Sequence, residues 1–220
     1  MRQFSIITLL ISLIFFSNSL PSYSAIKGRV HYALPIEYDK LSEQELNDKA
    51  KVYYHNALQY SSNNINDDIT MALMLYNILQ KINQNNTDYA VKTGVLYDKL
   101  DKDRHAKGNF SKAIRINSSL PDAYFYFGEF YYKREMYRDA LRYYKQAYNK
   151  GYNTHYDTLY RMGDIFQKFG DSRSSLKYLN EALAQSPNPD VIEKIQAVEL
   201  LDSNNREFYS STRIKQIYND

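Results

Sequence analysis

Small and bulky residues recur through the middle of the chain with a period of 34 or 35 residues. Glycines at 94, 128 and 163 form one series, and alanines at 113, 147 and 182 form a second. Alanines at 72, 106 and 140 form a third, which Ser175 continues, and bulky residues at 76, 110, 144 and 179 form a fourth. Four series that share one period indicate a repeat whose units bury their apolar faces against one another.

The best-formed block, residues 121–154, carries Tyr124-x₂-Phe127-Gly128-x₂-Tyr131 and then Ala140-x₃-Tyr144. Blocks 87–120 and 156–189 carry the same pattern around Gly94 and Gly163. The pattern resembles the tetratricopeptide repeat (TPR), which reads W-x₂-L-G-x₂-Y, then A-x₃-F, then P. The resemblance implies an all-α fold, a right-handed superhelical array of helix-turn-helix repeats, or TPR-like α-solenoid. Thr93 and Ser175 depart from the pattern because they are polar where it is apolar.

The periodic glycines fall inside the first helix of each pair, where Gly costs about 1 kcal/mol relative to Ala. A residue without a side chain lets two helices approach closely, so we expect Gly128 at a contact between helices. Gly108 lies outside this series, inside the second helix of the first repeat, and is expected to shorten that helix.

A divergent helix pair is predicted before the repeats, over residues 43–86. Ser42-Glu43-Gln44-Glu45 is a capping box, which predicts a helix from there to about Tyr60. A second helix is expected from about Asp68 to Ile82, after a loop at 61–67. Residues 25–42 show no helical period and are expected to be extended.

A C-terminal capping helix and tail are predicted over 190–220. Asn188-Pro189 is a helix start, with Asn as N-cap and Pro at the first position. The helix is expected over 190–201, with one apolar face made of Val191, Ile195, Val198 and Leu201. Residues 202–220 are expected to form a short, frayed helix.

Residues 1–24 have the order of a secretory signal: Arg2, an apolar run over 4–16, and a small, polar segment. Cleavage is predicted after Ser24, with export to the periplasm or the extracellular space. The alternative is an uncleaved membrane anchor, but the apolar run of about 13 residues is short of the roughly 20 that a spanning helix needs.

Composition excludes several classes of chemistry. The chain has 220 residues, 28 basic and 25 acidic side chains and no Cys, so disulfides and thiolate sites are ruled out. A net charge of +3 does not indicate a nucleic-acid-binding protein. The four histidines lie far apart and no catalytic motif is present, so we expect no enzyme activity, no cofactor and no metal site.

The resemblance to TPR proteins implies a ligand groove lined by the first helices. Its partner-binding residues map onto Asp98, Lys99, Phe125, Glu129, Tyr132, Lys133, Asp157, Tyr160, Asp164 and Lys168. Over the fifteen mapped positions, six acids against three lysines give a predicted net charge of −3, and Phe125, Tyr132 and Tyr160 are expected to form an aromatic shelf. The alternative is that these are ordinary solvated positions of the repeat.

Two functions therefore remain open. The first is a non-enzymatic interaction scaffold of a bacterial cell envelope, which holds an extended peptide or a helix of another protein in the groove. The second is an accessory subunit of an envelope-assembly or secretion machine, which docks through its basic second helices. These second helices, which lie on the convex side of a TPR superhelix, also offer a weak contact with an anionic envelope surface. The sequence indicates neither the identity of the partner nor an oligomeric state.

Overall fold

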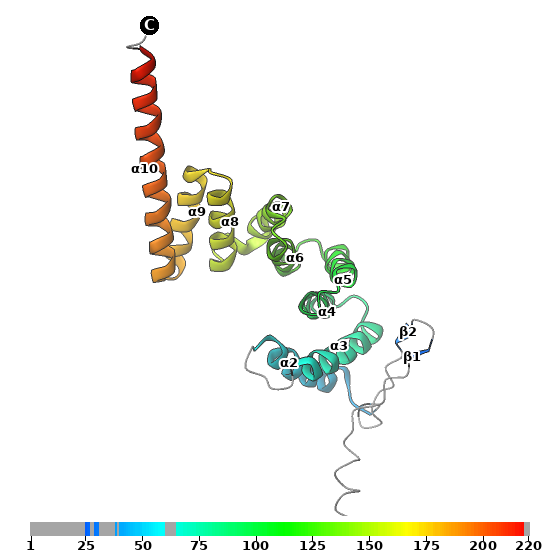
Figure 1. Cartoon of the computed structure of the whole chain (residues 1–220). Helices are drawn as coiled ribbons and strands as arrows, with labels where there is room; N and C mark the ends of the chain where they lie inside the picture. The colour runs from blue at the N-terminus through cyan, green and yellow to red at the C-terminus, as the bar shows by residue number, and fades with distance from the viewer. Residues whose placement is uncertain (1–24, 27–28, 31–37, 39, 60–64, 218–220) are drawn as a thin grey trace, which may run out of the picture. The chain divides into compact units, whose positions relative to one another are not determined.

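The computed structural model describes residues 25–26, 29–30, 38, 40–59 and 65–217 (Figure 1). The chain divides into two compact units, residues 1–75 and 76–220, with the boundary inside one helix. The predicted signal segment 1–24 lies outside the described residues. None of the helices in the described part is long and apolar enough to cross a membrane.

The described residues of the first unit form two very short strands, helix α2 and most of helix α3. Strand β1 (Ala25–Ile26) pairs antiparallel with β2 (Arg29–Val30), within the lead-in predicted to be extended. Helix α2 (Glu43–Leu58) begins at the predicted capping box: the Ser42 amide donates to Glu45 Oε2 at 2.8 Å and Ser42 Oγ accepts from the Glu45 amide at 3.3 Å. Helix α3 (Ile65–Ile82) starts three residues before Asp68, so the end of the predicted loop is helical.

The second unit contains three helix pairs in succession (Figure 1). They are α4 (Thr87–Lys99) with α5 (Asp103–Ile116), α6 (Pro121–Lys133) with α7 (Tyr137–Ala147), and α8 (Tyr156–Lys168) with α9 (Ser172–Gln185). A short π-helix, η2 (Tyr148–Tyr152), follows α7. Each pair packs on itself, and α5 packs on α6 as α7 packs on α8. The predicted all-α repeat fold is confirmed, whereas α5 runs through Gly108 without being shortened.

Within each pair, the periodic glycine contacts the bulky residue of the second helix. A Cβ atom added to Gly94 would lie 2.7 Å from the Phe110 ring, and one on Gly128 would lie 2.7 Å from the Tyr144 ring. A Cβ on Gly163 would lie 2.7 Å from Leu179 Cγ. Real Cβ atoms do not approach other atoms so closely, so only Gly fits these contacts. The prediction that Gly128 lies where two helices touch is confirmed.

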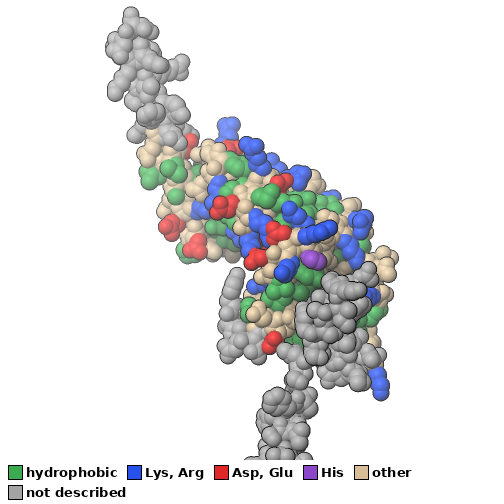
Figure 2. Space-filling model, turned by 45° about the vertical axis from the view of Figure 1, so that its right-hand side comes forward, with side chains coloured by type: hydrophobic (Ala, Val, Ile, Leu, Met, Phe, Trp, Pro, Cys, Tyr) green, Lys and Arg blue, Asp and Glu red, His purple; other side chains and the backbone are tan. Residues whose placement is uncertain are grey.

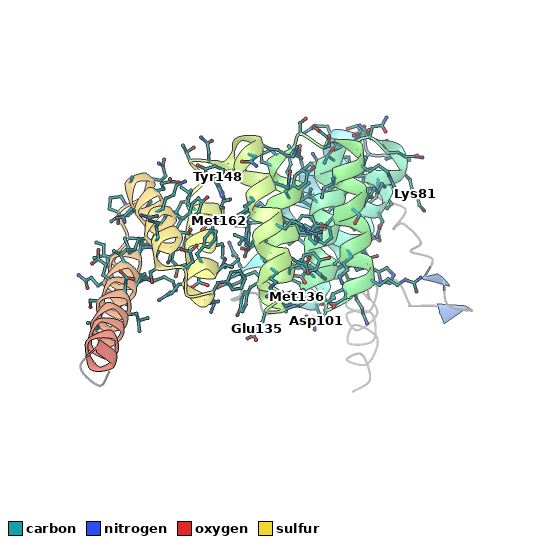
Figure 3. All side chains as sticks on the ribbon, turned by 90° about the horizontal axis from the view of Figure 1, so that it is seen from above. Lys81, Asp101, Glu135, Met136, Tyr148 and Met162 are labelled. Atoms are coloured by element: carbon teal, nitrogen blue, oxygen red, sulfur yellow. The ribbon has the colours of Figure 1, made fainter. Side chains whose placement is uncertain are left out.

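A left-handed residue reverses the chain between the two helices of each pair. Asp101 has φ of 52°, Glu135 has φ of 58° and Gly170 has φ of 75°. After each, the chain donates back to the first helix, as the Met136 amide does to the Tyr131 carbonyl at 3.0 Å. Figure 3 shows Asp101, Glu135 and Met136 along one edge of this unit. The repeated turn therefore gives each pair the same hairpin geometry.

Helix α10 (Pro189–Ile217) closes the array by packing on α9. As predicted, the Asn188 side chain accepts from the Asp190 amide, at 2.9 Å, and Val191, Ile195 and Val198 are buried. Two expectations were wrong. Leu201 is 54% exposed, because the packed face of the helix ends at Val198. The chain also continues as one helix to Ile217, in place of a short helix and a separate tail.

We predict that Gly128→Leu destabilises the protein, because Tyr144 is fully buried and has no room to move away from the new side chain. Overpacking of this kind costs about 1–3 kcal/mol of unfolding free energy. The matched control is Gly108→Leu, since nothing lies within 4 Å of a Cβ atom at that helical position. The free energy of unfolding of this control should rise by up to about 1 kcal/mol, because Leu has a higher helix propensity than Gly. Urea unfolding followed by circular dichroism measures both, and equal midpoints would contradict the packing role of Gly128.

Candidate functional site: the first-helix surface

Helices α4, α6 and α8 carry the residues assigned to partner binding, and we call these residues the first-helix surface. Side-chain caps fix the start of two of these helices. The Asn86 side chain accepts from the amides of Asp88 and Tyr89, and His155 Nδ1 accepts from the Thr158 amide. Helix α6 begins instead with Pro121 at its first position. With the helix ends fixed, equivalent residues of successive repeats lie in register.

Glu129 forms the centre of a polar network that joins two repeats. Arg161 from α8 reaches its carboxylate with Nε–Oε1 at 2.8 Å and Nη2–Oε2 at 3.2 Å. The Tyr144 hydroxyl donates to the same Oε1 from within the α6–α7 pair. Burial first, and then the nearby Glu129 charge, raise the pKa of Tyr144 above its ordinary value. The hydroxyl therefore remains a protonated donor, and Glu129 is already engaged from two sides.

Asp164 is the second such centre and is only 4% exposed. It accepts a hydrogen bond from the Tyr132 hydroxyl of α6 at 2.5 Å and forms an ion pair with Lys194 of α10. Burial alone would raise the pKa of Asp164, but these hydrogen bonds and the Lys194 charge outweigh it and hold the pKa below its ordinary value. Asp164 of α8 therefore connects α6 and α10, and its carboxylate is not available to line a ligand groove.

A third set of contacts joins α4 to α6. Arg134 Nη1 lies 2.6 Å from Asp98 Oδ1, and its Nη2 lies 2.5 Å from Asp103 Oδ1. The Arg134 guanidinium also lies 3.6 Å from the centre of the Phe130 ring. Lys133 contacts Asp101 Oδ1 at 2.8 Å, but this pair is exposed and contributes at most about 1 kcal/mol. Asp98 is thus largely neutralised within the protein.

The predicted aromatic shelf is not present as expected. Phe125 is 8% exposed and packs among the rings of Tyr144, Tyr152 and His155, with its centroid 4.9 Å from that of His155. It belongs to the core between repeats. The Tyr132 ring is half-buried beneath the Arg161 guanidinium, 4.4 Å away. Tyr160 remains half-exposed, stacked on Tyr156 with Lys194 over its ring at 5.5 Å.

The remaining assigned residues lie at the solvent, although Lys168 Nζ also lies 3.8 Å from Asp164 Oδ2. Asp157 is exposed and forms no ion pair with any described residue. Lys133 and Lys168 are exposed, and Lys99 is half-exposed. Figure 2 shows basic and acidic side chains interspersed on the visible face, in agreement with this pairing. The accessible part of the first-helix surface is therefore Asp157, Tyr160 and the lysines, and most of its acids hold the repeats together.

Sequence reasoning missed Arg134, Arg161 and Lys194, the cations that neutralise this surface. Arg161 follows Tyr160 directly, and Arg134 follows Lys133, so both lie just outside the positions assigned to the groove. The spacing of about one repeat between Glu129 and Arg161 is the signal that identifies such a pair. Among the described residues, no group of three His, Cys, Asp or Glu side chains could hold a metal ion.

We predict that Asp164→Asn lowers the unfolding free energy at pH 7 by about 1.5–3 kcal/mol, the range for hydrogen bonds to a charged group. The lowered pKa of Asp164 means that its stabilisation is present above about pH 4, the ordinary value, and is lost as the pH falls through the folded-state pKa. The difference from the wild type should therefore shrink as the pH falls below about 4. Asp157→Asn, the exposed control on the same helix, should change stability by less than about 0.5 kcal/mol.

A pH-independent difference for Asp164→Asn in urea unfolding would contradict this assignment. A loss of equal size in Asp157→Asn would do the same, because it would show that any carboxylate of α8 has this effect.

Comparison with known proteins agrees with the repeat fold. No protein family model matches the chain. A TPR repeat-containing protein of Methanocaldococcus jannaschii is 24% identical over 196 residues, which cover 83% of this chain. The chain spans about a third of the length of that relative, 33%.

Solved structures show the same likeness at low sequence identity. The crystal structure of MamA matches with a TM-score of 0.56 and 16% identity, over 63% of this chain and 81% of that one. The pilF protein of Pseudomonas aeruginosa matches with a TM-score of 0.60 and 15% identity, over 76% of both chains. YrrB, described as a TPR protein with an unusual peptide-binding site, matches at 0.50 and 19% identity, over 70% of this chain and 77% of that one. The fold of this chain is that of a TPR-like α-solenoid.

Proposed function

We propose that the protein is a non-enzymatic scaffold that binds a segment of another protein on its first-helix surface. The observation that carries this proposal is the set of contacts between repeats, Arg134–Asp98, Arg161–Glu129 and Tyr132–Asp164. These contacts fix successive first helices in one arrangement before any partner binds. A rigid surface loses little conformational entropy on binding, which favours recognition of an extended peptide or a helix. The peptide-binding site named for the similar YrrB structure supports the same class of function.

The partner segment would contact Tyr160 and Asp157 on α8, together with Lys168 at the end of that helix. Tyr160 offers a large half-exposed ring at a low entropy cost, as interface tyrosines do. Phe125 and Asp164, which the sequence placed in the same surface, act as structural residues and are excluded from this contact. Because Glu129 and Asp98 are neutralised internally, the ligand need not be strongly basic.

We predict that Asp157→Ala/Tyr160→Ala reduces capture of the partner by at least about thirtyfold, the equivalent of a hot-spot loss of about 2 kcal/mol. A photo-crosslinking side chain at Lys168, introduced in the protein's own cells, would capture the partner for identification and for affinity measurement. The matched control is Arg138→Ala/Arg173→Ala, which removes two exposed side chains from the second helices α7 and α9. Full capture by the first variant and loss by the control would place binding on the second helices instead.

The setting that we propose is the bacterial cell envelope, reached by export and cleavage of residues 1–24. The support is the signal-like order of the first residues, with small residues at Ser22 and Ser24. N-terminal sequencing of the protein from its native cells should therefore begin at Ala25. A protein that keeps Met1 and remains in the cytosol would contradict both the export and the envelope role.

A second candidate function is docking through the second helices, as an accessory subunit of an envelope-assembly or secretion machine. One observation favours it: Lys107, Lys145 and Lys177 lie on α5, α7 and α9 and form no ion pair with the described acids. Their charge is therefore available to a partner.

A further inference from the structure

Aromatic rings stack between the two helices of successive pairs. Tyr131 of α6 lies against Tyr143 of α7, with centroids 5.4 Å apart and planes at 7°. One repeat later, Phe166 of α8 lies against Tyr178 of α9, at 5.5 Å and 6°. All four rings are half-buried. The 35-residue spacing from Tyr131 to Phe166 and from Tyr143 to Tyr178 shows that the two stacks are equivalent.

At least one lysine side chain lies over each stack; Arg142 also lies over the Tyr143 ring, at 4.9 Å, but pairs with Asp139 at 2.9 Å. Lys107 Nζ of α5 lies 5.4 Å from the centre of the Tyr131 ring, and Lys145 Nζ of α7 lies 5.3 Å from that of Phe166. Lys177 Nζ of α9 lies 5.0 Å from that of Tyr178. In the first two cases the lysine reaches from a second helix to the first helix of the next pair. We call the four rings and three lysines the aromatic–lysine strip.

The cations of the strip have different partners from those of the first-helix surface. There, Arg134, Arg161 and Lys194 meet carboxylates, which neutralise them. In the strip, an aromatic ring holds each ammonium group in position by its quadrupole but carries no net charge. The ammonium groups therefore stay oriented and positive. An array of oriented cations that form no ion pair with the described acids is complementary to a line of carboxylates.

We propose that the aromatic–lysine strip binds an acidic, extended peptide segment of a partner protein. The proposal rests on the second candidate function and names the chemistry of its partner. The three lysines come from three successive second helices, so a ligand that meets all of them must be elongated. An extended chain of about 12 residues spans about 40 Å at about 3.3 Å per residue, enough to cross neighbouring helices 8–10 Å apart.

The strip suits a peptide better than a membrane or a nucleic acid. Three lysines alone attract an anionic membrane only weakly, by about 1 kcal/mol each. Stable surface binding also needs large apolar side chains that enter the bilayer, and none of the strip's rings is among the exposed large hydrophobic residues of the described chain. Single-stranded nucleic acid needs free ring faces for stacking bases. Here the faces of Tyr131 and Tyr143 are stacked on each other.

The test uses a fluorescein-labelled peptide of about 12 residues with alternating Glu and Gly, and the same peptide with Gln in place of Glu. Fluorescence anisotropy at low salt should detect the Glu peptide alone, with affinity that falls as salt screens the charges. The variant Lys107→Gln/Lys145→Gln/Lys177→Gln should weaken binding by at least about tenfold, or about 1.4 kcal/mol. The matched control, Lys40→Gln/Lys51→Gln/Lys81→Gln, removes the same charge from exposed lysines elsewhere and should change affinity by less than about twofold.

Several outcomes would overturn the proposal. Failure of the wild type to bind the Glu peptide would do so, as would equal losses in the two triple variants, which would show an effect of net charge alone. Tighter binding to phosphatidylglycerol vesicles or to a single-stranded oligonucleotide, lost in the strip variant, would assign the strip to that ligand instead. If the strip variant loses its partner in cells while the Glu peptide fails to bind, docking through the second helices stands and the acidic-peptide assignment falls.

Discussion

The close approach of two helices at each periodic glycine is the constraint on which the rest of the second unit depends. At Gly128 there is no side chain, so the Tyr144 ring lies directly against the backbone of α6. Held there, the Tyr144 hydroxyl reaches Glu129, the next residue after that glycine. Glu129 then holds Arg161 of the following repeat. A packing contact inside one pair thus fixes the polar contact that joins it to the next pair.

At the end of the array, the acid that follows the periodic glycine is held by different partners. The third pair has Leu179 where the second has Tyr144, so it supplies no hydroxyl to its own acid, Asp164. That acid is held by Tyr132 from the preceding repeat and by Lys194 from α10. Helix α10 therefore contributes both apolar burial against α9 and the last charge of the chain of contacts. It terminates the array by occupying the place of the next first helix.

Charged residues have different roles on the first and the second helices of the pairs. On the first helices, paired charges cross from repeat to repeat, and their main effect is to hold the repeats in register. On the second helices, Lys107, Lys145 and Lys177 lie over aromatic rings and form no ion pair with the described acids. The high tyrosine content, 23 residues, serves both arrangements, because a tyrosine ring can stack or hold a cation while its hydroxyl donates to a carboxylate.

The sequence by itself determined the repeats, their all-α architecture, and several helix starts, such as those at Ser42 and Asn188. These features depend on local patterns: a period, a capping residue, a glycine where a side chain has no room.

Only the tertiary structure decided which charged residues of α8 are buried and paired and which are exposed. Asp157 and Asp164 were assigned the same role from the repeat pattern, yet Asp157 is exposed and Asp164 is buried and paired. The two nearest partners of Asp164, Tyr132 and Lys194, lie 32 and 30 residues away on α6 and α10, so its burial depends on those neighbouring helices rather than on the residues beside it. The same reason places Phe125 in the core, because the rings of Tyr152 and His155 that cover it come from the junction with the next repeat.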